Sequence, residues 1–261
     1  MLPALLTACS GADLLNATVA TDTYRRTGDI AYGPEPRQRL DVYQPQGEFR
    51  NAPVVVFFYG GSWSKGERAD YRFVGEALAS QGIVAVVADY RLSPAVRWAR
   101  DHAAEYGADP ARLFVMGHSA GAYNAAMVAL DARWLQAEGM KPSQLAGWIG
   151  LAGPYDFLPI GDPQTQVAFE WPGTPADSQP LVHASRASPP ALLLAPTEDR
   201  SVNPQRSTVT MAQRLKKSGV RVASELFDGV SHVTIIASMA SVFRGRAPVL
   251  ERVAAFVKSP R

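Results

Sequence analysis

Short, mostly apolar runs that alternate with longer segments of helical character constrain the fold of this chain more than any other sequence feature. Continuous rather than alternating hydrophobicity is typical of strands that are buried on both faces of a parallel sheet. Strands and helices that take turns predict an α/β fold, in which helices cover both faces of one mostly parallel central sheet. The expected strands are 54–58, 83–88, 112–116, 147–151, 191–195 and 220–227, and the expected helices are 71–81, 95–106, 120–131, 207–218 and 247–257.

Two further regions complete the predicted domain. Residues 29–32 and 38–43 are expected to pair as an antiparallel hairpin at the sheet edge, because a Gly-Pro pair in their connection favours a turn. Residues 157–188 are rich in proline, glycine and polar residues without a strong period, which predicts a small cap segment over the carboxyl ends of the strands. No linker divides the 261 residues, so 21–261 is predicted to be a single domain.

The charge distribution and the spacing of metal-binding residue types argue against two kinds of partner, nucleic acids and metal ions. The 26 basic and 24 acidic residues are well mixed and give a formal net charge of +2, so we expect no nucleic acid to bind. His102, His118, His183 and His232 lack metal-ligand spacing, and the lone Cys9 completes neither a zinc site nor an internal disulfide. We therefore expect no metal and no cofactor, and structural or surface roles for His102 and His183.

Residues 1–20 carry a separate signal. Leu6-Thr7-Ala8-Cys9 resembles the lipobox at which bacterial lipoproteins are cleaved and acylated, which predicts a lipid anchor at Cys9. Met1–Ala8 is shorter than a normal apolar signal core and no Lys or Arg precedes it, so the alternative is a signal remnant with a flexible N-terminus. A cell-envelope location and a cytoplasmic one therefore both stay open.

The run Gly117-His118-Ser119-Ala120-Gly121 fits the pattern G-x-S-x-G, with an expected strand ending at Met116 and an expected helix rich in small residues starting at Ala120. A sharp turn there lifts the serine hydroxyl clear of the sheet, and glycines allow it to close because they have no Cβ atoms. Ser119 is therefore the candidate nucleophile of an α/β-hydrolase fold. We expect His118 to pack beside the site rather than to act as the base.

A serine hydroxyl needs a histidine to remove its proton and a carboxylate to orient that histidine. The chain order of this fold is serine, acid, histidine. His232 fits the last role because it lies in a polar loop after the final strong strand. For the acid we favour Asp199, in the loop that leaves strand 191–195, with Glu198 and Asp156 as the rivals.

The tetrahedral intermediate also needs hydrogen-bond donors for its oxyanion. One expected donor is the backbone N–H of Ala120. The others are expected from Tyr59-Gly60-Gly61-Ser62-Trp63, which follows the first core strand, because paired glycines let a backbone approach the substrate closely.

In combination these motifs resemble bacterial carboxylesterases of the α/β-hydrolase superfamily, close to the hormone-sensitive-lipase and feruloyl-esterase-like branches. The similarity runs from about Leu40 to the C-terminus. It rests on the glycine loop, on Asp89-Tyr90-Arg91-Leu92-Ser93-Pro94, on Asp109-Pro110, on the elbow, and on the loops of Asp199 and His232.

The resemblance implies that Gly61 and Ser62 donate to the oxyanion together with Ala120. Three departures stand out: Tyr59 replaces the usual histidine and Ser62 the third glycine, the segment after Pro94 is short, and 157–188 is too short for a lipase lid. The short segment after Pro94 has two possible consequences: it opens the acyl pocket, or it marks a destabilised variant of the fold.

The implied function is hydrolysis of small-molecule esters with short acyl chains through an acyl-enzyme. Tyr59, Trp63 and Tyr155 are the expected substrate-binding residues, and the aromatic residues Tyr123, Phe169 and Trp171 are further candidates for the pocket wall. Two alternatives stay open: an amidase or arylformamidase with the same triad, and a catalytically weak hydrolase-fold lipoprotein that acts in binding. The oligomeric state is also open.

Overall fold

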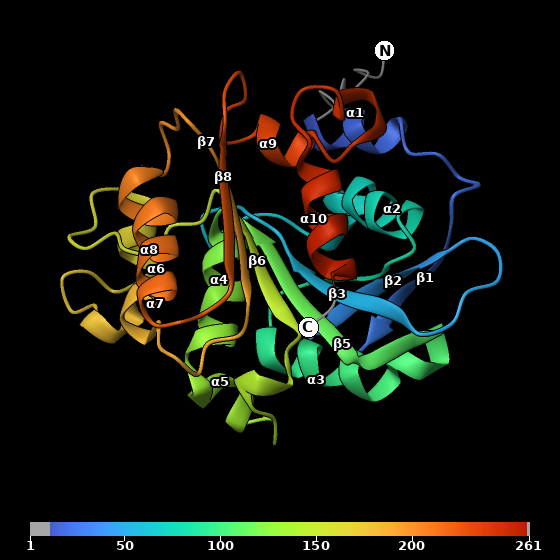
Figure 1. Cartoon of the computed structure of the whole chain (residues 1–261), viewed down its shortest axis with the longest axis horizontal. Coiled ribbons are helices and arrows are strands. Elements are labelled where there is room, and N and C mark those ends of the chain that lie inside the picture. Colours follow the sequence, from blue (N-terminus) through green and yellow to red (C-terminus); the bar gives the residue numbers. More distant parts are fainter. Residues whose placement is uncertain (1–10, 260–261) are drawn as a thin grey trace, which may run out of the picture.

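The apolar runs form one eight-stranded sheet in the computed structural model, which describes residues 11–259 (Figure 1). The strand order is β1-β2-β4-β3-β5-β6-β7-β8; β2 runs antiparallel to β1 and β4, and all other neighbours are parallel. This confirms the mostly parallel sheet and the edge hairpin. The strands are β1 Tyr24–Ala31, β2 Arg39–Pro45, β3 Ala52–Phe58, β4 Val84–Ala88, β5 Ala108–His118, β6 Gly147–Leu151, β7 Ala191–Pro196 and β8 Val222–Phe227.

Helices α3, α4 and α8 cover one face of the sheet, and α2 and α10 cover the other (Figure 1). The helices are α1 Gly11–Ala17, α2 Arg72–Ser80, α3 Leu92–His102, α4 Ala120–Leu130, α5 Ala132–Gln136, α6 Pro163–Ala168, α7 Pro180–His183, α8 Thr210–Lys217, α9 Thr234–Ala237 and α10 Val249–Lys258. Short 3₁₀ segments lie at Arg68–Tyr71, Ala103–Tyr106, Pro142–Gln144, Ala176–Ser178 and Ser241–Phe243, and a π-helical turn, Gln205–Val209, leads into α8.

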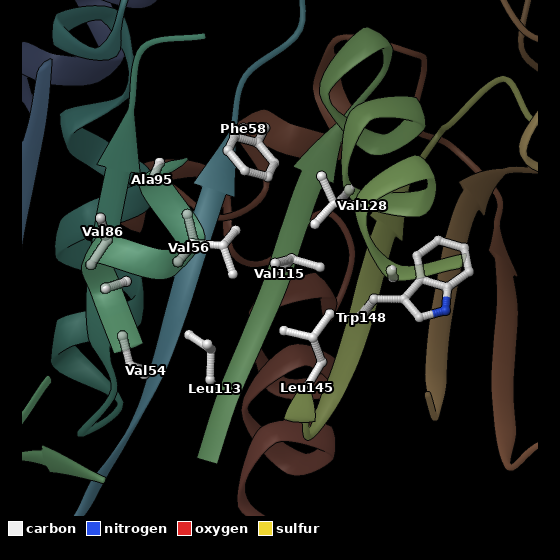
Figure 2. Packing of buried hydrophobic residues seen from close by; sticks show 14 of the residues in the cluster. Val54, Val56, Phe58, Val86, Ala95, Leu113, Val115, Val128, Leu145 and Trp148 are labelled. Atoms are coloured by element: carbon white, nitrogen blue, oxygen red, sulfur yellow. The ribbon is translucent and has the colours of Figure 1, made fainter. Parts of the chain in front are cut away.

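Strand β3 shows why the apolar runs are continuous. Val54, Val56 and Phe58 pack in the cluster beneath α3 and α4, where Figure 2 shows them beside residues of β4 and β5. Val55 and Phe57 point the other way, into the cluster beneath α2 and α10. Because successive side chains of a strand point to opposite faces, a sheet covered on both sides requires apolar residues at every position.

Helix α3 begins earlier than expected, at Leu92 instead of residue 95, directly after β4 ends at Ala88. Pro94 lies in its first turn, where the missing N–H breaks no helical hydrogen bond. The residues that follow Pro94, where the sequence was expected to carry a shortened segment, therefore belong to α3.

The described part of the N-terminal segment is an ordered helix, α1. Asn16 donates to the carbonyl of Ala69 (2.8 Å) and accepts from the amide of Phe73 (3.2 Å), which attaches α1 to the start of α2. Cys9 lies outside the described residues, so its lipid anchor stays a prediction. Among residues 11–259, no helix has the length and apolar character needed to cross a membrane.

Residues 157–188 leave the sheet after β6 and contain two short helices, α6 and α7, that the sequence pattern did not predict. Asp162 caps α6 by accepting hydrogen bonds from the amide and the hydroxyl of Thr165, both at 2.7 Å. The hydroxyl of Tyr123 on α4 donates to the carbonyl of Ser178 (2.7 Å), which connects the segment to the helix behind the elbow.

Candidate active site

The turn between β5 and α4 holds Ser119 in a rare backbone conformation, with φ 55° and ψ −123°. A Cβ atom at Gly117 would overlap the backbone of Gly121, and one at Gly121 would overlap the carbonyl oxygen of Phe58. Both glycines therefore permit the close crossing of strand and helix, as the motif predicts. The Ser119 amide donates to the carbonyl of Leu151 (2.9 Å), which fastens the turn to β6.

The structure brings Ser119, His232 and Asp199 into one hydrogen-bonded chain. His232 Nε2 lies 2.7 Å from Ser119 Oγ, and His232 Nδ1 lies 2.7 Å from Asp199 Oδ2. A carboxylate can only accept, so Nδ1 carries the proton, and Nε2 of the neutral ring accepts from the serine hydroxyl. This is the tautomer that a general base needs.

Asp199 is fixed on both of its oxygens. Oδ1 accepts from the amides of Ser201 (2.7 Å) and Val202 (3.0 Å), and Oδ2 accepts from His232. Burial alone would raise the pKa of Asp199, but the hydrogen bond from His232 and those from the two amides outweigh it and hold the pKa below its usual value. The carboxyl group therefore stays ionised next to the imidazole.

The two rival carboxylates face elsewhere. Asp156 is paired with Arg206 (3.2 Å), and Glu198 is exposed, with no hydrogen bond or ion pair to another described residue. The remaining histidines are also used elsewhere: His102 lies 2.7 Å from Glu105 at the surface, and His183 Nε2 lies 2.6 Å from the carbonyl of Asp177.

His118 is buried between the elbow and the loop of His232. Its Nε2 lies 2.8 Å from the backbone carbonyl of His232, and the two rings are 5.1 Å apart. Burial, and next the neighbouring His232, lower the pKa of His118 to about 3. His118 is therefore neutral at ordinary pH, and among residues 11–259 neither of its ring nitrogens is hydrogen-bonded to the serine hydroxyl, which is bonded to His232 instead.

The glycine loop lies against the elbow. A Cβ atom at Gly60 would lie 3.1 Å from Ser119 Cβ, so the missing side chain lets the loop reach the nucleophile. Gly61 has a φ of 130° and Ser62 a φ of 49°. Among residues 11–259 neither of their amides has a hydrogen-bond acceptor, and both residues line the same cleft as Ala120.

A cleft of about 730 Å³ opens over Ser119 and His232. The elbow residues 118–120 lie at its base, and its walls come from the loop 60–63 with Tyr71, from Pro154 and the start of the 157–188 segment, and from the residues that follow β7 and β8. Residues that the sequence analysis did not assign to the site are Tyr71, Pro154, Phe157, Ile160, Gly161, Asp162, Thr165, Arg200, Ser201, Val202, Val233 and Ile236. Only their position after strands, at the edge where such folds bind ligands, signalled them in advance.

Trp63 lines the cleft and is held by neighbours on three sides. Its ring packs edge-on against Phe169 (4.7 Å between centroids) and Tyr123 (5.3 Å), and its Nε1 donates to Asn124 Oδ1 (3.3 Å). Phe157 joins this group at 5.9 Å from Trp63. The cleft therefore has a rigid aromatic wall.

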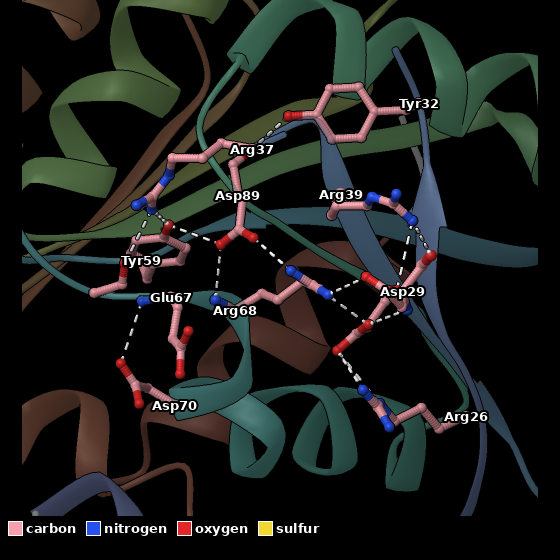
Figure 3. Close-up of polar contacts among 12 residues, drawn as sticks. Arg26, Asp29, Tyr32, Arg37, Arg39, Tyr59, Glu67, Arg68, Asp70 and Asp89 are labelled. Atoms are coloured by element: carbon pink, nitrogen blue, oxygen red, sulfur yellow. Dashed lines mark hydrogen bonds and ion pairs between the residues drawn. The ribbon is translucent and has the colours of Figure 1, made fainter. Parts of the chain in front are cut away.

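Tyr59 was predicted to bind substrate, and this prediction is wrong. Its side chain is fully buried and outside the cleft lining, because its hydroxyl donates to Asp89 (2.9 Å) and accepts from Arg37 (2.7 Å) (Figure 3). Arg68 joins the same network and bridges Asp89 (2.6 Å) and Asp41 (3.2 Å). These two carboxylates are almost completely buried, so the network sets the direction of the Tyr59 ring.

The prediction for Tyr155 is also wrong. Its ring is fully buried against Trp148, at 5.7 Å between centroids and nearly perpendicular, and it does not line the cleft. The side chain belongs to the core cluster beneath α3, α4 and α8, and burial raises the pKa of its hydroxyl.

The segment after Pro94 forms no wall of the cleft, since no residue between 72 and 117 lines it. Across the described residues, no group of three or more His, Cys, Asp or Glu side chains is arranged to hold a metal ion.

An eight-stranded, mostly parallel sheet with a serine at a strand-to-helix elbow, followed in the chain by an acid and a histidine, defines the α/β-hydrolase superfamily. Residues 40–215 match the family model described as BD-FAE, which covers more than half of the chain. The protein therefore belongs to the BD-FAE family.

Two curated proteins are similar to this chain in sequence. A probable isoprenylcysteine alpha-carbonyl methylesterase from Arabidopsis thaliana is 29% identical over 79% of this chain and 50% of its own length. A kynurenine formamidase from Danio rerio is 31% identical over 51% of this chain and 47% of its own length. The chain thus spans about half the length of these curated relatives.

Among solved structures, EstE1, a thermostable carboxylesterase cloned from a metagenomic library, superposes with a TM-score of 0.73 over 95% of this chain and 94% of its own. At 21% sequence identity, this likeness supports the fold alone.

Proposed function

We propose that this protein is a serine carboxylesterase that hydrolyses short-chain acyl esters through an acyl-enzyme intermediate. The observation that carries the proposal is the chain of two 2.7 Å contacts from Ser119 through His232 to Asp199 at the floor of an open cleft. A histidine that is oriented by a carboxylate and hydrogen-bonded to a serine hydroxyl activates that serine as a nucleophile.

The reaction follows from the roles of the three side chains. Ser119 Oγ attacks the ester carbonyl as His232 Nε2 takes its proton. His232 then returns the proton to the leaving alcohol, whose departure leaves the acyl group on Ser119. Asp199 stabilises the imidazolium between these steps and keeps its Nδ1–H in place. Water repeats the sequence with the acyl-enzyme, which releases the acid and restores the serine.

The amides of Gly61, Ser62 and Ala120 are the proposed donors to the oxyanion. Among residues 11–259 the amides of Gly61 and Ser62 have no acceptor, which supports this role, because these donors are available for the charge that develops on the substrate. Ala120 is the first residue of α4, so the helix N-terminus also favours negative charge there.

Short acyl groups suit the size and walls of the cleft. Trp63 and Phe157 supply an apolar wall, and the small segment 157–188 adds only one short helix, α6, at its rim. We therefore expect a short acyl chain to be preferred over a long one, which this sparse cover would leave partly exposed to water.

The test is hydrolysis of p-nitrophenyl esters from acetate to decanoate by the wild type and by Ser119→Ala. We expect the rate to be highest for acetate to butyrate and to be lost in the variant. Activity retained by Ser119→Ala would contradict the proposed mechanism, and an inactive but folded wild type would favour a binding role for this hydrolase fold.

A second candidate is an amidase or arylformamidase with the same three residues. The similarity to a kynurenine formamidase favours it, since that relative is named for cleavage of a formamide. Comparing kcat/KM for an aryl acetate and for a formylated aromatic amine separates the two candidates.

A further inference from the structure

His118 contacts the catalytic machinery without touching the reacting atoms. We propose that His118 is a positioning residue, which holds the loop of His232 in place through a hydrogen bond to the His232 backbone carbonyl. This inference rests on the proposed function and adds a residue to it.

The direction of this hydrogen bond follows from its partner. The carbonyl of His232 can only accept, so His118 donates from Nε2, at 2.8 Å. The pKa of His118, lowered to about 3 by burial, keeps the ring neutral, so its second nitrogen carries no proton. That nitrogen, Nδ1, is buried and has no partner among the described residues. The ring is therefore held in one tautomer by one contact.

The two ends of the contact differ in how firmly they are held. His118 is the last residue of β5 and precedes Ser119 in a turn fixed by close backbone packing. His232 lies between β8 and α9, in a loop where Asp228, Gly229, Ser231 and Val233 are exposed. Val230 packs in the core and the Ser231 amide donates to Thr234 Oγ1 (2.6 Å), so the loop is anchored on both sides of His232. The contact from His118 adds a direct tie between the His232 main chain and the element that carries the nucleophile.

The contact acts on a part of His232 that the other partners leave free. Asp199 and Ser119 hold the imidazole ring, whereas His118 holds the main chain. With both held, the ring reaches the serine at one distance and angle. Without the main-chain contact the ring can reach Asp199 from several positions, and a displacement of about 1 Å can cost about 100-fold in rate.

Two substitutions separate the hydrogen bond from the space that the ring fills. His118→Gln keeps an N–H donor at a similar reach, and His118→Met has similar length with no donor. Both are unbranched at Cβ, which suits a tightly packed site, since a Cβ atom at Gly60 would lie only 3.1 Å from His118 Nδ1. His183→Met is the matched control, since His183 Nε2 also contacts a backbone carbonyl (2.6 Å) but lies outside the cleft.

The experiment measures kcat and KM for p-nitrophenyl acetate in these variants, in His232→Ala and in the double variant His118→Met/His232→Ala. We expect His118→Met to lower kcat about 10- to 100-fold with little change in KM, and His118→Gln to recover most of the loss. In the His232→Ala background, His118→Met should have no further effect, because its role passes through His232. His183→Met should match the wild type.

Two results would overturn the inference while the wild type is active: kcat within twofold of wild type in His118→Met, or a further loss in the His232→Ala background. If His118→Met does not fold, His118→Asn, which is too short to reach the carbonyl, takes its place. An inactive wild type would refute the proposed function itself, which keeps the two failures apart.

Discussion

Replacing Asp199 with asparagine tests the site sharply, because the surrounding donors decide how the new amide must sit. Oδ1 of Asp199 accepts from the amides of Ser201 and Val202, and Oδ2 accepts from His232 Nδ1. Asparagine has one acceptor oxygen and one NH₂ donor. If the NH₂ group faced the amides of Ser201 and Val202, one donor group would face two N–H donors with no acceptor among them. The oxygen must therefore turn toward the amides and the NH₂ group toward the imidazole.

This orientation forces His232 into the wrong tautomer. Nδ1 must accept from the asparagine, so the ring proton moves to Nε2, which can no longer take the proton of Ser119. We expect kcat for p-nitrophenyl acetate to fall about 10⁴-fold, the loss known for the same change in a serine-protease triad, or about 5.5 kcal/mol in the activation barrier. KM should change little, because Asp199 does not line the cleft.

Asp199→Ala is the control. It removes the carboxylate but imposes no tautomer, so it should retain more activity than Asp199→Asn. Steady-state kinetics on both variants, with thermal melting to confirm folding, makes the comparison. An asparagine variant within tenfold of the wild type, or one more active than the alanine variant, would refute this reasoning.

Three further predictions concern stability. Gly121→Ala should lower the free energy of unfolding by about 3 kcal/mol or more, measured by urea denaturation, because its methyl group would overlap the backbone at the end of β3; a change below 1 kcal/mol would contradict this packing. Arg68→Met should lower the free energy of unfolding by about 3 kcal/mol, because it removes the ion pair of the buried Asp89 carboxylate, whereas Asp41 keeps Arg26 at 2.9 Å; an unchanged midpoint in the same denaturation would show that the network contributes nothing. The third prediction concerns acid. The pKa of His118 is near 6.5 in the unfolded chain and about 3 in the folded protein. The unfolded state therefore binds one more proton, and the free energy of unfolding falls as the pH falls through this range. The slope of the free energy of unfolding against pH should approach about 1.4 kcal/mol per pH unit in the wild type and should be smaller in His118→Gln. Parallel curves for the two proteins between pH 6.5 and 4 would contradict this prediction.

The sheet was predictable from the sequence because burial on both faces leaves a local mark, the continuous apolar run. The elbow was predictable for a similar reason: Gly117 and Gly121 are needed by the turn itself, whatever surrounds it. The order of Ser119, Asp199 and His232 followed from the strands that precede them, and the structure joins them by hydrogen bonds.

Features that depend on distant contacts were not predictable. Tyr59 follows a core strand beside the glycine loop, and only Asp89 and Arg37, far away in the sequence, turn its ring into the core. Helix α1 is stabilised by contacts of Asn16 with the start of α2. Helix α6 did leave a signal, an Asp162-Pro163 pair at its start, which is a common way to begin a helix.

Covalent labelling of Ser119 tests the central claim most directly. The folded protein is treated with a fluorophosphonate and analysed by mass spectrometry of its peptides, alongside Ser119→Ala and His232→Ala. We expect one adduct per chain, on the peptide that contains Ser119, absent in the serine variant and formed far more slowly in the histidine variant. An active protein that carries no adduct, or carries it at another residue, would contradict the assignment of Ser119 as the nucleophile.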